Sequence, residues 1–125
     1  MELYPFLKSL ADQDESPIVI CDLAHTIVYM NPAACQRYAP YGGEKLLGGN
    51  LLRCHSKKAG QQIQRVIAWF EQSVDHNRVY TFYNPEENKD VYMIALRNEA
   101  GALIGYYEKH AYRNRDTAPL YAMHE

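Results

Sequence analysis

The residues that could do chemistry in this chain are few, and the most conspicuous are the adjacent Cys54 and His55. A cysteine thiolate and an imidazole are both good ligands for a transition metal. Two neighbouring residues in regular structure cannot point to the same ion, so we expect at most one of them to be a ligand. The alternative is structural: His55 helps to cap a helix that begins near Ser56, and Cys54 packs inside the domain.

The other candidate groups do not form a catalytic set. Three cysteines, Cys21, Cys35 and Cys54, are an odd number without CxxC spacing, which argues against a disulfide framework and a structural zinc site and favours reduced thiols. The remaining histidines are His25, His76, His110 and His124, and their spacing predicts no Ser-His-Asp triad. The spacing of the acidic residues likewise predicts no pair of catalytic carboxylates. The chain also lacks a GxGxxG or phosphate-binding loop. We therefore expect a protein that is not an enzyme.

Length and charge narrow the class of protein further. A chain of 125 residues fits one domain with a real core, and a net charge of −2 gives no general attraction to nucleic acid or to anionic membranes. No apolar run is long enough to span a bilayer, and the polar start MELYPFLKSLADQDE is unlike a signal peptide. We expect a cytoplasmic protein. Its 11 tyrosines suit a pocket that hydrogen-bonds a ligand or a surface that meets a partner.

The stretch from Ser16 to Cys35 predicts a hairpin followed by a helix. Ile18–Cys21 and Ile27–Met30 are short apolar runs rich in β-branched residues, and Asp22 begins a polar turn between them. Asn31-Pro32 then gives a helix start, because the Asn side chain accepts an otherwise unpaired N–H and Pro suits the first helical position.

Helical and strand periodicities divide the rest of the chain. A short amphipathic helix is expected within Met1–Asp14, either to cover the sheet or to make a dimer contact. Brief, glycine-broken helical pieces at Pro32–Tyr38 and Glu44–Leu47 precede a long helix from Ser56 to Val74. Period-two runs at Arg78–Tyr83, Val91–Arg97 and Ala102–Tyr112 predict an antiparallel meander. The fold class is α+β, with five antiparallel strands, the helices inserted between strands two and three, and a short N-terminal helix.

Three segments in this order resemble the PAS sensor-domain family. Asp22 with Ile27–Ala34 is similar to the family's hairpin-to-helix signature of strand, Asn, any residue and Ala. Leu46–Leu52 resembles its leucine-glycine-asparagine turn before the long helix, and Asn98–Gly105 resembles its closing hairpin. The resemblance implies a PAS-like domain over 16–112, after a lead-in helix at 1–15 and before a C-terminal extension at 113–125.

The resemblance also implies which cofactors to consider. Flavin-adduct members need a Cys within an Asn-Cys-Arg-Phe-Leu-Gln segment, which falls near Asn50–His55 here, but Cys54 is not at that position; we do not expect a flavin adduct. Haem-binding members use a His on or near the long helix as the axial ligand, so haem with His55 is the alternative cofactor. Otherwise the cofactor is unknown.

If the strands alternate inward and outward side chains as they do in the PAS family, the sequence predicts which side chains line a space between the sheet and the helices. This candidate ligand-binding set is Val19, Cys21, Cys35, Tyr38, Leu52, Ile63, Ile67, Phe82, Met93, Ala95 and Tyr107. These side chains either enclose a ligand-sized pocket or fill the core to normal density. Two functional hypotheses follow, with the haem sensor as a third and a small enzyme of α+β type as a fourth. The first is a small-molecule sensor or regulatory module that binds an apolar or aromatic metabolite, dimerises and acts through a separate output protein. The second is a ligand-free interaction and dimerisation module.

Overall fold

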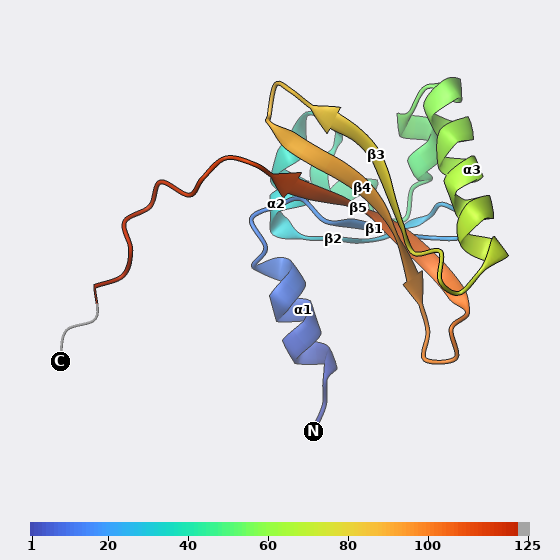
Figure 1. The fold of residues 1–125 in the computed structure, drawn as a ribbon, viewed down its shortest axis with the longest axis horizontal. Helices are drawn as coiled ribbons and strands as arrows, with labels where there is room; N and C mark the ends of the chain where they lie inside the picture. The colour runs from blue at the N-terminus through green and yellow to red at the C-terminus, as the bar shows by residue number, and fades with distance from the viewer. Residues whose placement is uncertain (123–125) are drawn as a thin grey trace.

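The computed structural model describes residues 1–122 and has the expected order of elements (Figure 1). The elements are α1 (Tyr4–Asp12), β1 (Val19–Asp22), β2 (Ile27–Met30), α2 (Pro32–Arg37), the short 3₁₀ helices η1 (Ala39–Tyr41), η2 (Gly43–Leu46) and η3 (Leu51–Cys54), α3 (Lys57–Gln72), β3 (Arg78–Asn84), β4 (Lys89–Arg97) and β5 (Leu103–Tyr112). The predicted α+β fold class, with all helices after the first placed between β2 and β3, is confirmed.

A single antiparallel sheet joins the early hairpin to the late meander in the strand order β2-β1-β5-β4-β3. The last strand, β5, is therefore central, and it pairs with β1 on one side and β4 on the other. Tyr106 lies opposite both Cys21 and Ala95, and Glu108 lies opposite Met93. Since paired residues share a face of a sheet, these side chains all face the same way. The register of β5 thus sets the composition of that face.

The close approach of β5 to β1 needs a glycine. A Cβ atom on Gly105 would lie 2.3 Å from the backbone oxygen of Cys21, far inside van der Waals contact. The clash would be with backbone, which cannot swing aside as the end of a side chain can. Gly105 therefore permits the pairing that brings the two halves of the sheet together.

The core lies between the inner face of the sheet and α3. Phe70 and Ile67 on α3 are buried at 0% and 7% exposure, and they pack with Cys21, Met93 and Tyr106 from the sheet. Ser56 begins α3 as predicted, because its hydroxyl accepts a hydrogen bond from the Ala59 N–H. At the other end of α3, the Arg97 guanidinium donates to the backbone oxygens of Phe70, Ser73 and His76.

Asn31 connects three segments at the start of α2. Its side-chain oxygen accepts from the N–H groups of Ile18 and Ala34, at 2.9 Å each. Its amide group donates to the backbone oxygens of Ala11, Asp14 and Ser16 at 3.0, 3.2 and 2.9 Å. The predicted helix cap at Asn31 is confirmed, and the same side chain also fastens the end of α1 to the domain.

The N-terminal helix does not cover the sheet, which was one of its two expected roles. In Figure 1, α1 projects away from the sheet, and none of its residues is buried. Leu3, Phe6, Leu7 and Leu10 are 53–75% exposed. Tyr29 on β2 hydrogen-bonds Asp12, and Asn31 donates to Ala11, so the hydrogen bonds from the domain reach the helix at its C-terminal end.

Residues 113–122 of the expected C-terminal extension form no helix or strand, and they run away from the sheet (Figure 1). The remainder of that extension, 123–125, which includes His124, lies outside the described residues. Over residues 1–122, no helix combines the length and apolar character needed to cross a membrane.

Candidate functional site

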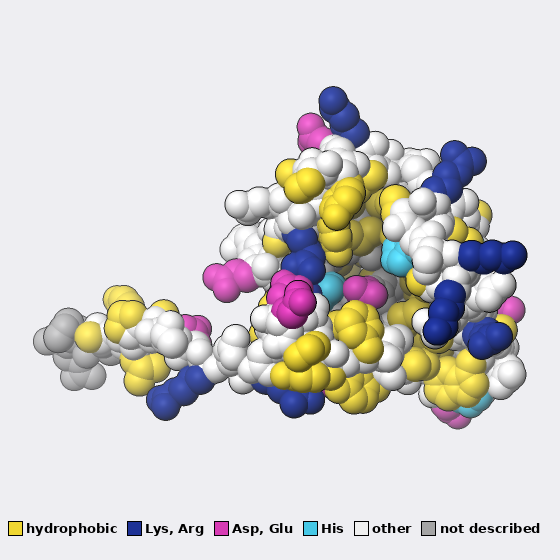
Figure 2. All heavy atoms as spheres, turned by 90° about the horizontal axis from the view of Figure 1, so that it is seen from above, with side chains coloured by type: hydrophobic (Ala, Val, Ile, Leu, Met, Phe, Trp, Pro, Cys, Tyr) yellow, Lys and Arg dark blue, Asp and Glu magenta, His cyan; other side chains and the backbone are white. Residues whose placement is uncertain are grey.

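A cavity of about 550 Å³ lies between the inner face of the sheet and the helical segments. This volume is within the range of small-molecule sites in proteins. Figure 2 shows the cavity as a hollow, with hydrophobic side chains inside it and histidine and acidic side chains beside its opening. Fourteen residues line it: Pro17, Val19, Ile27, Tyr38, Tyr41, Leu46, Leu51, Cys54, His55, Ile63, Met93, Tyr106, Glu108 and His110.

The helical wall of the cavity is built from short pieces that are tied to the edge strand β2. The Ile27 N–H donates to the Gly49 oxygen at 2.9 Å, and the Gly48 N–H donates to the Ile27 oxygen at 2.8 Å. Leu51 donates to the His25 oxygen at 2.8 Å. These bonds hold η2 and η3 over the cavity, so that Leu46, Leu51 and Cys54 reach it while the glycines between them leave the backbone irregular.

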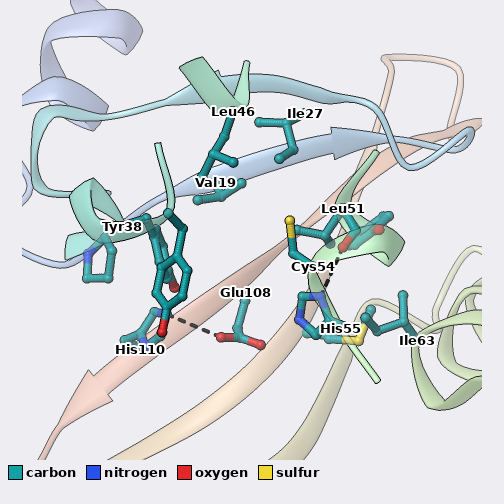
Figure 3. A pocket seen from close by; sticks show the side chains of 14 residues that line it. Val19, Ile27, Tyr38, Leu46, Leu51, Cys54, His55, Ile63, Glu108 and His110 are labelled. Atoms are coloured by element: carbon teal, nitrogen blue, oxygen red, sulfur yellow. Dashed lines mark hydrogen bonds and ion pairs between the residues drawn. The ribbon is translucent and has the colours of Figure 1, made fainter. Parts of the chain in front are cut away.

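The polar end of the cavity is formed by β5, which supplies Glu108 and His110. The Glu108 carboxylate lies 3.4 Å from Nε2 of His110, and Figure 3 places Glu108 between His110 and His55. Burial raises the pKa of Glu108, whereas burial together with the nearby Lys89 and Arg37 charges lowers the pKa of His110 to about 4. Both shifts oppose ionisation of their own group, so His110 is neutral at pH 7 and the contact is not a strong ion pair.

The accessible surface of Glu108 and the shift of its pKa indicate different degrees of burial, and the position of Glu108 in the cavity explains the difference. Its side chain keeps 46% of its accessible surface, yet burial is the main cause of its raised pKa. Because Glu108 lines the cavity, that accessible surface lies in a concave wall where protein surrounds the carboxylate on several sides. We therefore treat it as a partly desolvated acid rather than an ordinary surface glutamate.

A second charged cluster lies next to this polar end. Arg37 makes a bidentate pair with Glu87 at 2.6 and 2.8 Å, and Nζ of the buried Lys89 lies 3.1 Å from the same carboxylate. The Arg37 guanidinium lowers the pKa of Glu87 to about 2. Among the described residues, Lys89 Nζ and His110 Nδ1 are buried without a well-formed hydrogen bond. The two cations therefore share one acid, and neither side chain lines the cavity.

Four of the eleven sequence-predicted site residues line the cavity: Val19, Tyr38, Ile63 and Met93. Cys21 and Ile67 are buried in the core beside it, and Cys35 and Ala95 pack against that core. Leu52 lies against Gly60 of α3. Burial raises the pKa of the Cys21 thiol to about 11, so this thiol is protonated at neutral pH.

Two of the eleven residues differ from the predicted arrangement. Tyr107 was predicted to face the helices, but it pairs with Ile20 and Ile94 on the opposite face from Tyr106 and Glu108, so that prediction is wrong. Phe82 lies opposite Val91 as the parity requires, but β3 is an edge strand and the Phe82 side chain is 51% exposed. It contributes no surface to the cavity.

The sequence reasoning missed the most polar part of the site. Tyr106, Glu108 and His110 were not in the predicted set because Tyr107 was given the inward position, which is a shift of one residue along β5. The signal that could have identified them is the pairing rule itself: Glu108 and His110 stand at even-numbered positions with Tyr106, so they share its face of β5. The sequence analysis also gave packing inside the domain as the alternative to metal binding by Cys54. In the structure Cys54 is exposed and lines the cavity.

The residues that line the cavity do not suit haem. His55 lines it, and its Nδ1 donates to the Leu51 oxygen at 3.0 Å, which leaves Nε2 as the free ring nitrogen. However, the described lining contains an acid, Glu108, and no Lys or Arg for the carboxylates of a porphyrin. The charge of the wall thus does not fit haem. Over residues 1–122, no three His, Cys, Asp or Glu side chains are grouped closely enough to hold a metal ion.

Comparison with solved structures identifies the fold. A PAS domain from Colwellia psychrerythraea is similar with a TM-score of 0.63 and 15% identity, over 90% of this chain and 100% of that one. A sensory box sensor histidine kinase from Vibrio cholerae has a TM-score of 0.55 and 18% identity, over 87% and 90% of the two chains. The Aer2 receptor from Vibrio cholerae, a dual PAS-heme oxygen sensor, has a TM-score of 0.54 and 17% identity, over 78% and 94%.

These likenesses show that the chain has a PAS-like fold, in agreement with the resemblance of its sequence motifs. No family model matches the sequence, and no curated protein matches it.

Proposed function

We propose that this chain is a non-enzymatic sensory module that binds a small apolar or aromatic molecule in the cavity between the sheet and the helices. The observation that carries the proposal is the cavity itself: about 550 Å³, with mostly apolar walls and a few polar groups that converge at one end. A domain whose core was filled to normal density would leave no such space. The PAS-like fold supports the same role, because the Vibrio cholerae structures it resembles are a sensor kinase and an oxygen sensor.

A binding role suits the cavity better than a catalytic one. The side chains that could act as nucleophile or base there are Cys54, His55, Glu108 and His110. In the described residues no hydrogen bond joins the Cys54 thiol to either histidine, and His55 Nδ1 is already occupied by a backbone oxygen. The pairing of nucleophile and base that covalent catalysis uses is therefore missing from this wall.

A conformational change caused by the ligand would be transmitted through the elements that enclose it. The segment from Ala39 to Cys54 forms the irregular wall, and β5 places Glu108 in the cavity and its neighbours Tyr107 and Lys109 on the other face of the sheet. A ligand shifts this structure only if it binds two arrangements of the wall with different affinity. We propose that such a shift alters the outer sheet face, where a separate output protein reads it.

A screen of a metabolite library by thermal shift tests the binding role, with a variant that fills the cavity as its control. Ile63→Phe adds a ring to a side chain that lines the cavity, while Val28→Phe makes a similar change at a side chain that is 54% exposed. We expect compounds that stabilise the wild type and Val28→Phe but not Ile63→Phe. An absence of stabilising compounds, or equal stabilisation of all three proteins, contradicts the proposal.

We propose homodimer formation as a second property, because α1 presents apolar side chains that the domain does not cover. Leu7 and Leu10 on α1, and Leu3 at its N-cap, are all more than half exposed. Exposed apolar stripes of this kind are commonly buried by association. Light scattering coupled to size exclusion should give the mass of a dimer for the wild type and of a monomer for Leu7→Lys. A monomeric wild type at micromolar concentration removes this part of the proposal.

A further inference from the structure

The polarity of the cavity is one-sided, which restricts the chemistry of its ligand. Seven lining residues are purely apolar: Pro17, Val19, Ile27, Leu46, Leu51, Ile63 and Met93. Among the described residues of the lining, Glu108 is the only Asp, Glu, Lys or Arg. Figure 3 shows Glu108 reaching into the cavity across from Val19, Leu46 and Ile27. A ligand in this space meets apolar surface on one side and a carboxylate on the other.

The carboxylate is not neutralised by its neighbours. Within the described part of the chain, the only ion-pair partner within 4 Å of Glu108 is His110, whose imidazole is uncharged at neutral pH because burial lowers its pKa to about 4. The charges of His55, Lys89 and Arg37 lower the pKa of Glu108, but none of the three forms an ion pair with it, and Lys89 and Arg37 both contact Glu87. They act on Glu108 only at longer range. A partly desolvated carboxylate without a direct cationic partner is unfavourable unless a ligand supplies that partner.

The histidine beside Glu108 adds a second acceptor. The oxygen of Leu51 can only accept, so His55 Nδ1 donates that hydrogen bond, and Nε2 is the ring nitrogen that stays available to a ligand. Glu108 and His55 are neighbours in the cavity wall (Figure 3). Together they offer acceptors to a group that has more than one N–H donor.

We infer that the ligand of this cavity carries a protonated nitrogen, such as an ammonium or amidinium group, on an apolar, preferably aromatic body. The nitrogen is held by Glu108 and His55, and the body fills the space between Val19, Ile63 and Met93. This inference rests on the proposed binding function and specifies its ligand class. Carboxylic acids of the same shape are excluded, because their charge would meet the Glu108 carboxylate in a poorly solvated wall.

Three probes with one body and different head groups test the inference by calorimetry at pH 7.5. They are 2-phenylethylamine, 2-phenylethanol and 3-phenylpropanoate. A charge-assisted hydrogen bond in a partly buried site favours the amine over the alcohol by about tenfold or more. We expect the amine to bind most tightly and the carboxylate least. In Glu108→Gln the preference for the amine should be lost, while the affinity for the alcohol stays within about twofold.

Glu99→Gln is the matched control, because it removes the same charge at an exposed turn residue that does not line the cavity. Its binding should equal that of the wild type, and circular dichroism of Glu108→Gln should be that of a folded protein. An amine that binds no better than the alcohol, or a preference that survives Glu108→Gln, overturns the inference, yet binding of the alcohol then leaves the proposed function standing. If none of the three probes binds at millimolar concentration, the inference is overturned, and the library screen with Ile63→Phe decides the proposed function independently.

Discussion

Asn31 is the residue whose removal we expect to have the largest effect on stability for its size. Its side chain is fully buried at 0% exposure and makes five hydrogen bonds, two as acceptor and three as donor. In Asn31→Ala the N–H of Ala34 loses its helix cap, a loss of about 0.5–2 kcal/mol. The N–H of Ile18 is left without a partner, which costs a further amount of about 1–3 kcal/mol.

The total loss is therefore about 1.5–5 kcal/mol, a large part of the stability of a typical small domain. The effect should also be local, because the three carbonyls that Asn31 holds belong to the end of α1 and the segment that follows it. Urea unfolding followed by circular dichroism measures the total. Hydrogen exchange should show faster exchange at the amides of Ile18 and Ala34 and throughout α1.

Asn50→Ala provides the matched control. Asn50 also caps a helical turn, with its side chain accepting from the Leu52 N–H at 2.8 Å, but the residue is exposed and makes that one cap only. We expect a loss of no more than about 1 kcal/mol there. If Asn31→Ala loses no more stability than Asn50→Ala, the five-bond connection has no energetic significance and our reasoning about the α1 attachment is refuted.

Three further predictions concern the elements that hold the cavity open. Arg97→Ala leaves the carbonyls at the end of α3 without their donors, so urea unfolding should show a loss of stability of about 2–4 kcal/mol. Arg97→Lys should restore only part of that stability, because lysine lacks the planar guanidinium. Equal stability of the wild type and Arg97→Ala would show that water replaces these bonds. Gly105→Ala places a Cβ against the Cys21 oxygen and should lower stability by about 1–3 kcal/mol, measured in the same way, whereas an unchanged midpoint would mean that β1 and β5 can separate freely. The folded pKa of His110, about 4, lies below the ordinary value of 6.5, so the unfolded chain binds more protons between these values and stability should fall as the pH is lowered from about 6.5 to about 4. This part of the pH dependence should disappear in His110→Gln, and an identical profile in that variant would show that His110 is not the group responsible.

The sequence predicted most of the fold because its local signals agree with its long-range contacts. The strand Ile27–Met30 has the predicted bounds, and the caps at Asn31 and Ser56 are made by the side chains expected to make them. The resemblance to PAS domains rested on turns whose residue types are demanded by backbone geometry. Such signals act over a few residues, so they can be recognised without knowledge of the rest of the structure.

The site was predicted less completely because it depends on register and on irregular backbone. Tyr106 and Tyr107 are adjacent aromatic residues in a strand, and either could face inward until pairing with Cys21 and Ala95 fixes the choice. The wall from Ala39 to Cys54 has no periodicity that would show which side chains reach the cavity. Its position is set by backbone bonds to β2, which no local pattern encodes.

The most direct test of the central claim is methyl NMR of the isotope-labelled chain during titration with 2-phenylethanol and 2-phenylethylamine. We expect shifts of the Ile27, Ile63 and Met93 methyl groups, which line the cavity, and no shift of Ile104, which is 52% exposed and does not line it. Shifts confined to Ile104, or none at the three cavity methyl groups at saturating probe, would contradict the claim that a ligand enters between the sheet and α3.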